Sequence, residues 1–176
     1  QKIIVSCDKD YLQLCNDSTI VYCPTTNKIW NKNRVLEEFH IHPTNFALAK
    51  AIIGDKSDNI KGVPRIGFKT LVKLFPWFAN ADLISVEDVI SEGREKRLAN
   101  IVNGTGLIKE NLRLMQLYLP EISLEVADKI NLTLGGFRPQ FNQTGTMTKM
   151  IKDDFVGIDF NFLFATFKKI ISDSED

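Results

Sequence analysis

The order of apolar and polar residues in the first part of the chain predicts a small α/β unit. Residues Lys2–Ser6 and Thr19–Cys23 are short runs rich in β-branched residues, which is the composition of buried strands. Between them, the apolar residues of Tyr11–Cys15 suggest a short helix that begins after Asp10, and residues 24–27 form a turn sequence. A strand, a helix and a second strand in this order predict a parallel sheet.

From Val35 onward the pattern becomes helical. Pro43 is a favourable first residue of a helix, and apolar residues from Phe46 to Ile53 recur at helical spacing. Further helices are expected at residues 70–75, 86–90, 106–117 and, as an amphipathic terminal helix, 159–171. Residues 132–148 are rich in Gly and Thr and are expected to form a connector.

Composition excludes several classes of protein. With 44% hydrophobic and 25% charged residues, the 176-residue chain can build a packed core, so it is neither disordered nor a disulfide-dependent miniature. No apolar run reaches the roughly 20 residues that a membrane span needs. The chain has 22 basic and 22 acidic residues, so its net charge predicts no partner. Its three cysteines have no zinc-like spacing and are expected to be free thiols of an intracellular protein.

The balanced total conceals a local excess of cations. Residues 61–113 contain nine basic and six acidic side chains. Four of the basic residues stand four apart with no acid between them: Lys61, Arg65, Lys69 and Lys73. On a helix, this spacing aligns several cations along one face. Such a face can contact an anionic partner or only water, and charge alone leaves both interpretations open.

Two acidic pairs are candidate metal ligands. Asp8 and Asp10 follow the first predicted strand, and the carboxyl ends of parallel strands are where open α/β sheets bind ligands. Carboxylates suit Mg²⁺ or Mn²⁺ better than zinc. The same pair can instead serve the local fold, with Asp10 as a helix cap and Asp8 in the turn.

The second pair, Asp55 and Asp58, lies in the sequence Gly-Asp-Lys-Ser-Asp-Asn. At a spacing of three residues, both carboxylates are expected on one face of a helix. Carboxylates so close repel each other and need either a cation or exposure to water. A metal ion supplies the first, and a solvent-exposed helix end supplies the second.

A third motif covers residues 60–70, Ile-Lys-Gly-Val-Pro-Arg-Ile-Gly-Phe-Lys-Thr. We interpret it as a helix–hairpin–helix in which Gly62 and Gly67 bracket a tight turn, while Val63 and Ile66 point inward. Glycine lets the backbone approach a ligand, and N–H groups at a helix start can bind a phosphate. The motif therefore predicts a grip on the DNA backbone without base readout. The expected contacts are Lys61, Gly62, Arg65, Gly67, Lys69, Thr70 and Lys73.

In their order and separation, the three motifs resemble the 5′-nuclease superfamily: flap endonucleases, the 5′-nuclease domain of DNA polymerase I, and phage 5′-exonuclease/ribonuclease H enzymes. The resemblance implies an α/β fold in three parts. Residues 1–35 would belong to a PIN-like parallel-sheet nuclease domain, and residues 36–131 would form a mostly helical helix–hairpin–helix (H3TH) domain. Residues 132–176 would be a connector and a terminal helix. The size of the chain suggests a phage enzyme.

The resemblance also implies two-metal hydrolysis of DNA or RNA–DNA phosphodiesters, as in DNA replication and repair. Asp8 and Asp10 would lie near one Mg²⁺ or Mn²⁺, and Asp55 and Asp58 would hold a second ion about 3.5–4 Å away. The hairpin would hold duplex or branched DNA, such as a 5′ flap, a nick or an RNA–DNA hybrid. The carbonyl groups at two positions of the hairpin would bind K⁺: Val63 and Ile66.

Two departures from the family pattern change what we expect of the hairpin and of the activity of the isolated chain. Arg65 stands where the family usually has glycine, so a positive φ there would strain the residue, unless the turn differs or Arg65 contacts a phosphate. The family's first strand, its other carboxylates and its basic arch would all precede Gln1. We therefore expect a carboxyl-terminal portion that by itself binds DNA weakly and cleaves it poorly or not at all. The amino-terminal half would lie in the same or a separate chain.

The main alternative is a non-catalytic DNA-binding module, and a third is a toxin-like ribonuclease on a related sheet. A binding module has no use for four carboxylates, because they repel a phosphate, so the acids favour the nuclease. His40 and His42 lack further metal ligands and are expected to be structural. Trp30 and Trp77 are expected to be core or surface anchors.

Overall fold

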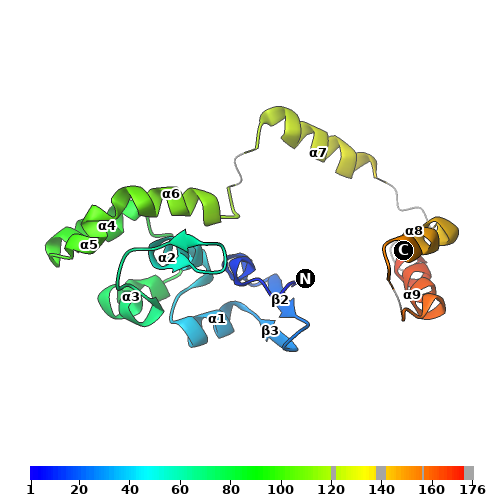
Figure 1. Ribbon diagram of the computed structural model, residues 1–176, viewed down its shortest axis with the longest axis horizontal. Helices are drawn as coiled ribbons and strands as arrows, with labels where there is room; N and C mark the ends of the chain where they lie inside the picture. Colours follow the sequence, from blue (N-terminus) through cyan, green and yellow to red (C-terminus); the bar gives the residue numbers. More distant parts are fainter. Residues whose placement is uncertain (120–121, 138–141, 156, 173–176) are drawn as a thin grey trace. The chain divides into compact units, whose positions relative to one another are not determined.

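The chain forms a mixed α/β structure in two compact units, Gln1–Glu121 and Ile122–Asp176 (Figure 1). The computed structural model describes residues 1–119, 122–137, 142–155 and 157–172. None of the helices in these ranges combines the length and apolar character that crossing a membrane requires. The domain boundaries expected after residues 35 and 131 stay predictions.

Unit 1 begins with a three-stranded sheet. Strands β1 (Lys2–Val5) and β2 (Thr19–Cys23) pair in parallel, as predicted, and β3 (Lys28–Trp30) pairs antiparallel with β2. The connection from β1 to β2 is the 3₁₀ helix η1 (Lys9–Leu14). The sequence pattern did not predict β3, because three residues are too few to show an alternation.

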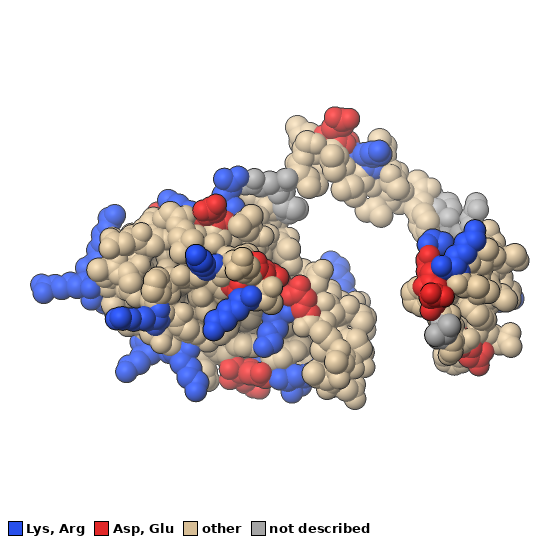
Figure 2. Space-filling model, in the orientation of Figure 1, with Lys and Arg blue, Asp and Glu red and all other residues tan. Residues whose placement is uncertain are grey.

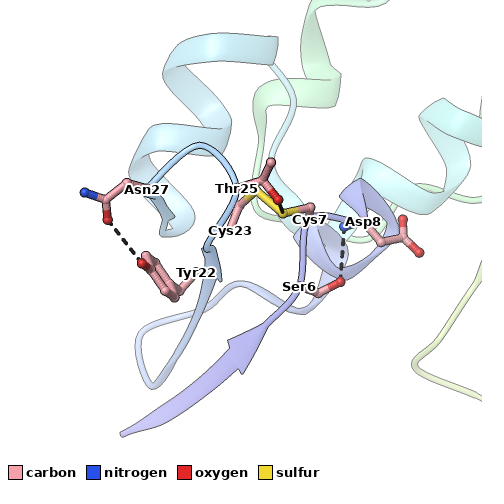
Figure 3. The surroundings of a disulfide bond; sticks show 7 residues. All are labelled: Ser6, Cys7, Asp8, Tyr22, Cys23, Thr25 and Asn27. Carbon is pink, nitrogen blue, oxygen red and sulfur yellow. Dashed lines mark hydrogen bonds between the residues drawn. A yellow bond between two sulfur atoms is a disulfide. The ribbon is translucent and has the colours of Figure 1, made fainter. Parts of the chain in front are cut away.

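A disulfide bond between Cys7 and Cys23 joins the ends of β1 and β2 (Figure 3). The Ser6 amide donates to the Tyr22 carbonyl at 2.9 Å, so the parallel pairing brings the next residues of both strands together, with their Cα atoms 4.5 Å apart. The expectation of three free thiols is therefore wrong for these two, since a separation of 16 residues does not reveal that the strands are neighbours. Cys15 is a free, buried thiol, and burial raises its pKa to about 11.

The rest of unit 1 is mostly helical and is built around α2 (Phe46–Ile53), which is apolar on nearly all sides and buried from Phe46 to Ile52. Helix α6 (Thr105–Met115) packs along it. The remaining elements are α1 (Lys32–Phe39), η2 (Pro43–Asn45), β4 (Gly54–Asp55), β5 (Ile60–Lys61), α3 (Phe68–Leu74), η3 (Pro76–Ala79), α4 (Val86–Glu95) and α5 (Ala99–Asn103). The predicted helices thus occur, with shifted ends.

Unit 2 contains α7 (Leu124–Gly136), α8 (Gln143–Lys152) and α9 (Phe160–Ser172). The predicted terminal helix is confirmed as α9, but the connector expected over residues 132–148 is wrong for its described parts. Residues 132–136 end α7, and residues 143–148 lie in α8. Glycines mark the carboxyl end of α7, and Asn142 caps α8 by accepting from the Gly145 amide at 2.8 Å. The turn-forming residues therefore mark helix ends. Residues 138–141 lie outside the described residues.

Candidate metal centre

Three acidic residues from two distant segments meet in unit 1. Asp10 belongs to η1, Asp55 ends β4, and Asp58 lies in the turn between β4 and β5. One carboxylate oxygen from each lies within 4.8 Å of the others. Two oxygens on opposite sides of a Mg²⁺ ion are about 4.2 Å apart. The three acids are thus close to the spacing that a shared ion requires.

The acids reach this position by a route that the sequence did not predict. Helix α2 ends at Ile53, and Gly54 has a φ of 82°, which turns the chain into the β4–β5 hairpin. The expected helix carrying both Asp55 and Asp58 is therefore wrong. Glycine is required at both ends of this hairpin. A Cβ on Gly54 would lie 2.3 Å from the Gly62 nitrogen, and one on Gly62 would lie 2.0 Å from the Ile53 carbonyl oxygen. The chain's own backbone thus fills the space beside Gly62.

Asp8 is separate from the cluster of three. Its carboxylate accepts a hydrogen bond from the Asp10 amide at 2.9 Å and so caps η1, the role that the alternative interpretation of the sequence gave to Asp10. Asp8 nevertheless lines a cavity of about 510 Å³ together with Asp55 and Asp58. The cavity therefore places Asp8 and the second acidic pair, Asp55 and Asp58, around one space.

Lys50 is the neighbour that sequence reasoning missed. It lies on α2, its side chain is only 9% exposed, and its ammonium group is ion-paired with Asp10 and, at 2.5 Å, with Asp55. Burial acts to lower the pKa of Lys50, but the hydrogen bonds to the two carboxylates outweigh it and raise the pKa above its ordinary value. A single charge within an apolar helix was the signal that could have found it, because a buried lysine needs a partner.

Asp55 is held as a carboxylate from two sides. Lys50 contacts Oδ2, while Oδ1 accepts from the Ser57 amide at 2.8 Å and from the Ser57 hydroxyl. The Lys50 contact and then the Ser57 contacts hold the pKa of Asp55 well below its usual range. Asp55 is therefore ionised at neutral pH, as a metal ligand must be.

Two buried amides fix the segments that carry the acids to α6. Asn111 donates to the carbonyl oxygens of Ala51 at 2.9 Å and Lys61 at 2.8 Å. Gln13 donates to the carbonyl oxygens of Asp10 at 2.9 Å and Met115 at 3.0 Å. Nothing in the sequence pattern distinguishes either amide from a surface residue. They are positioning residues for the cluster.

The segment expected to bind DNA follows β5. Val63 and Ile66 are buried, and Gly67 caps α3 with open space around its Cα. Arg65 has a φ of 68°, so the expected positive φ occurs with a non-glycine residue. The cations of this segment are all exposed: Lys61, Arg65, Lys69 and Lys73. Figure 2 shows blue side chains projecting from the part of unit 1 where α3 lies.

Comparison with curated proteins gives 5′-3′ exonucleases and DNA polymerase I among the relatives. The 5′-3′ exonuclease of Buchnera aphidicola from Schizaphis graminum is 42% identical over 80 residues, covering 46% of this chain and 28% of that protein. The 5′-3′ exonuclease of Buchnera aphidicola from Acyrthosiphon pisum is 32% identical over 132 residues, covering 74% and 46%. DNA polymerase I of Bacillus subtilis is 30% identical over 118 residues, covering 64% and 13%. The chain thus spans less than half the length of these relatives. No family model matches it.

Solved structures agree with these relatives. A variant of the bacteriophage T5 5′-exonuclease superposes with a TM-score of 0.54 at 29% identity, covering 64% of this chain and 46% of that one. In sequence and in fold, the chain is similar to the 5′-3′ exonuclease and flap endonuclease superfamily. The expected resemblance is therefore confirmed. A second superfamily structure, a T5 flap endonuclease in a pseudo-enzyme–product complex with DNA and metal ions, has a TM-score of 0.54 at 27% identity, covering 64% and 42%.

The donor set of the cluster fits a hard divalent cation. Its three clustered groups are all carboxylates, and no histidine or cysteine belongs to the cluster among the described residues. Oxygen-only sites favour Mg²⁺ or Mn²⁺. Asp10, Asp55 and Asp58 are the residues that would hold such an ion.

Proposed function

We propose that this chain is part of a structure-specific 5′ nuclease that hydrolyses DNA or RNA–DNA phosphodiesters with divalent metal ions. One observation carries the proposal: acids from η1 and from the β4–β5 hairpin converge to within 4.8 Å of one another, directly before a segment of exposed cations. A phosphodiester backbone needs cations for binding, and its cleavage needs a site that collects further positive charge. Both requirements are met within residues 8–73.

Asp10, Asp55 and Asp58 would hold one ion, and Asp8, across the same cavity, would help to hold a second. When bound, such ions supply a nucleophilic hydroxide and stabilise the charge on the scissile phosphate. The chain's own contribution is to keep these carboxylates ionised and fixed. Lys50 and Ser57 do so for Asp55, and Gln13 fixes the backbone at Asp10. Further carboxylates and a basic arch would come from another part of the same or a separate chain.

The DNA would lie across the start of α3. Lys61, Arg65, Lys69 and Lys73 would neutralise phosphates, and Gly67 and Thr70 would donate hydrogen bonds to them. K⁺ would bind the carbonyl oxygens of Val63 and Ile66. The T5 complex with DNA and metal ions supports this assignment at the level of the superfamily.

The test is a cleavage and binding assay on a 5′-flap substrate with Mg²⁺ or EDTA. We expect weak, Mg²⁺-dependent cleavage by the isolated chain. Replacing Asp55 and Asp58 together by Asn should reduce cleavage at least about 100-fold, while DNA binding in EDTA is kept or becomes tighter, since two charges that repel phosphate are gone. Asp17→Asn, which removes an exposed acid paired with Lys32, is the matched control. If neither cleavage nor DNA binding responds to the metal, the nuclease assignment is wrong.

A non-catalytic DNA-binding module is the second candidate. It is favoured by the ion pairs of Lys50, which partly compensate the charges of Asp10 and Asp55 without any metal. For such a module, the Asp55 and Asp58 replacements would leave DNA binding equal in Mg²⁺ and in EDTA.

A further inference from the structure

Lys50 occupies the space between two of the three clustered carboxylates. Its stem comes from the buried side of α2, and its ammonium group contacts Asp10 Oδ1 and, at 2.5 Å, Asp55 Oδ2. The same residue lines the cavity shared by Asp8 and Asp58. The lysine therefore sits where the two acid-bearing segments meet and faces the space from which an ion would enter.

Few acceptor positions on Asp55 are left for an ion. Oδ1 already accepts from the Ser57 amide and hydroxyl, and Oδ2 accepts from Lys50. A Mg²⁺ ion binds carboxylate oxygens at about 2.1 Å, and an ammonium nitrogen lies about 2.7–2.9 Å from the carboxylate oxygen to which it donates. An ion that used the same oxygens of Asp10 and Asp55 would thus need the space that the ammonium fills. Two cations so close in a half-buried site also repel strongly.

The third acid, Asp58, keeps the cluster attractive to a metal ion. Asp58 is exposed and has no ion-pair partner among the residues that the structure describes. Three carboxylates against one ammonium leave the cluster negative, so a divalent ion is still attracted to it. The lysine lowers that attraction without removing it.

We propose that Lys50 is a built-in competitor of the divalent ion: it holds Asp10 and Asp55 together in the metal-free protein and must leave them when the metal binds. This inference rests on the proposed metal role of Asp10, Asp55 and Asp58. It makes metal binding an exchange of one cation for another. Lys50 thereby weakens metal affinity and keeps the metal-free site folded.

The test is a Mn²⁺ titration of the full chain, followed by the electron paramagnetic resonance signal of the free ion. Lys50→Met keeps the length and apolar stem of the side chain but removes the charge. It should bind Mn²⁺ at least about tenfold more tightly than the wild type. The thermal midpoint of the metal-free variant should fall, and saturating Mn²⁺ should raise it by more than in the wild type. Lys50→Arg, which keeps the charge, should retain weak binding. Lys32→Met removes an equivalent cation from the exposed pair with Asp17 and should change nothing.

Each outcome either supports or overturns the proposed role of Lys50. Equal or weaker Mn²⁺ affinity of Lys50→Met, with binding still abolished by the Asp55 and Asp58 replacements, overturns the competitor role and leaves the nuclease proposal standing. If Mn²⁺ does not bind, or if its affinity is unchanged by the Asp55 and Asp58 replacements, both the competitor role of Lys50 and the nuclease proposal are overturned. If Lys50→Met folds only with Mn²⁺, the role is supported. If it does not fold at all, Lys50→Gln decides by the same titration.

Discussion

At the scale of single residues, His42 shows how one side chain links local structure to pH. It precedes η2, and its ring nitrogen Nδ1 accepts from the Thr44 amide at 3.3 Å and lies 2.9 Å from the Thr44 hydroxyl. Burial, followed by the charge of Lys32, lowers the pKa of His42 below its ordinary value, although Asp17 acts in the opposite sense. The expectation of a structural role for His42 thus has a physical basis, since the neutral ring is the form that accepts.

The first prediction concerns acid sensitivity. The folded state favours the neutral His42 ring, so the unfolded state binds more protons once the pH falls below about 6.5. The free energy of unfolding should therefore decrease between pH 7.5 and pH 5.5. In His42→Asn, the amide oxygen still accepts from the backbone but does not titrate, so the decrease should be smaller. Urea denaturation at both pH values measures the difference.

His40→Asn is the control for this prediction. His40 has a φ of 55°, a conformation that asparagine tolerates well, and its ring is not part of the η2 cap. This variant should keep the pH dependence of the wild type. The prediction is wrong if the free energy of unfolding depends on pH equally in the two variants.

At the scale of elements, the sequence was informative wherever a segment's local pattern decided its structure. The β-branched runs around Ile4 and Val21 predicted β1 and β2, and Pro43 with its apolar sequel predicted α2. The sequence pattern gave a wrong prediction where contacts with backbone distant in the sequence determine the local structure. Gly54 turns the chain after α2 because the Gly62 backbone lies against it. The spacing of Asp55 and Asp58 in the sequence contains no information about this contact.

The residues of the candidate site also fall into those that the local sequence identifies and those that depend on distant contacts. Short motifs identified the carboxylates, since an acid after a strand or before a glycine-rich turn is visible locally. Lys50, Gln13 and Asn111 were not identified, because each of them has a partner that lies 40 to 104 residues away. Arg65 is an intermediate case: comparison with the family's glycine raised a left-handed backbone as one of the alternatives, and the φ of 68° shows that this alternative occurs.

The second prediction is that α6 holds the acid-bearing hairpin through Asn111. Asn111→Leu removes both hydrogen bonds and leaves the buried Ala51 carbonyl oxygen and the partly buried Lys61 carbonyl oxygen without this partner. The free energy of unfolding should fall by about 2–3 kcal/mol. Amide hydrogen exchange should accelerate most in β4 and β5, since the hairpin loses its attachment to α6. Urea denaturation and exchange mass spectrometry measure the two effects.

A matched change shows whether the location of the amide matters. Asn100 is exposed and donates one hydrogen bond, to the Pro64 carbonyl oxygen at 3.1 Å. Asn100→Leu should cost less than about 1 kcal/mol, because water can replace the lost donor. Equal losses for the two variants, or unchanged exchange in the hairpin of Asn111→Leu, would contradict the positioning role.

At the scale of the whole molecule, core and candidate site lie in the same unit. Among the described residues of unit 2, only Phe164 is a buried hydrophobic residue, and α7 has no buried residue at all. The acids, Lys50 and the exposed cations all lie before residue 74. Stability and metal binding of unit 1 should therefore depend little on residues 122–176.

The third prediction follows from this division: a chain of residues 1–121 should fold by itself and keep the metal site. Because the buried amides that fix the acids bond only within unit 1, as Gln13 does with Leu117 at 2.8 Å, the truncation removes none of their partners. Its thermal midpoint should stay within about 4 °C of that of the full chain, which corresponds to a change of about 1 kcal/mol or less. Its Mn²⁺ affinity should agree within about twofold, and Asp58→Asn should weaken binding equally in both chains. Scanning calorimetry and Mn²⁺ titration test this directly. A truncated chain that folds but loses Mn²⁺ binding would mean that unit 2 completes the metal site.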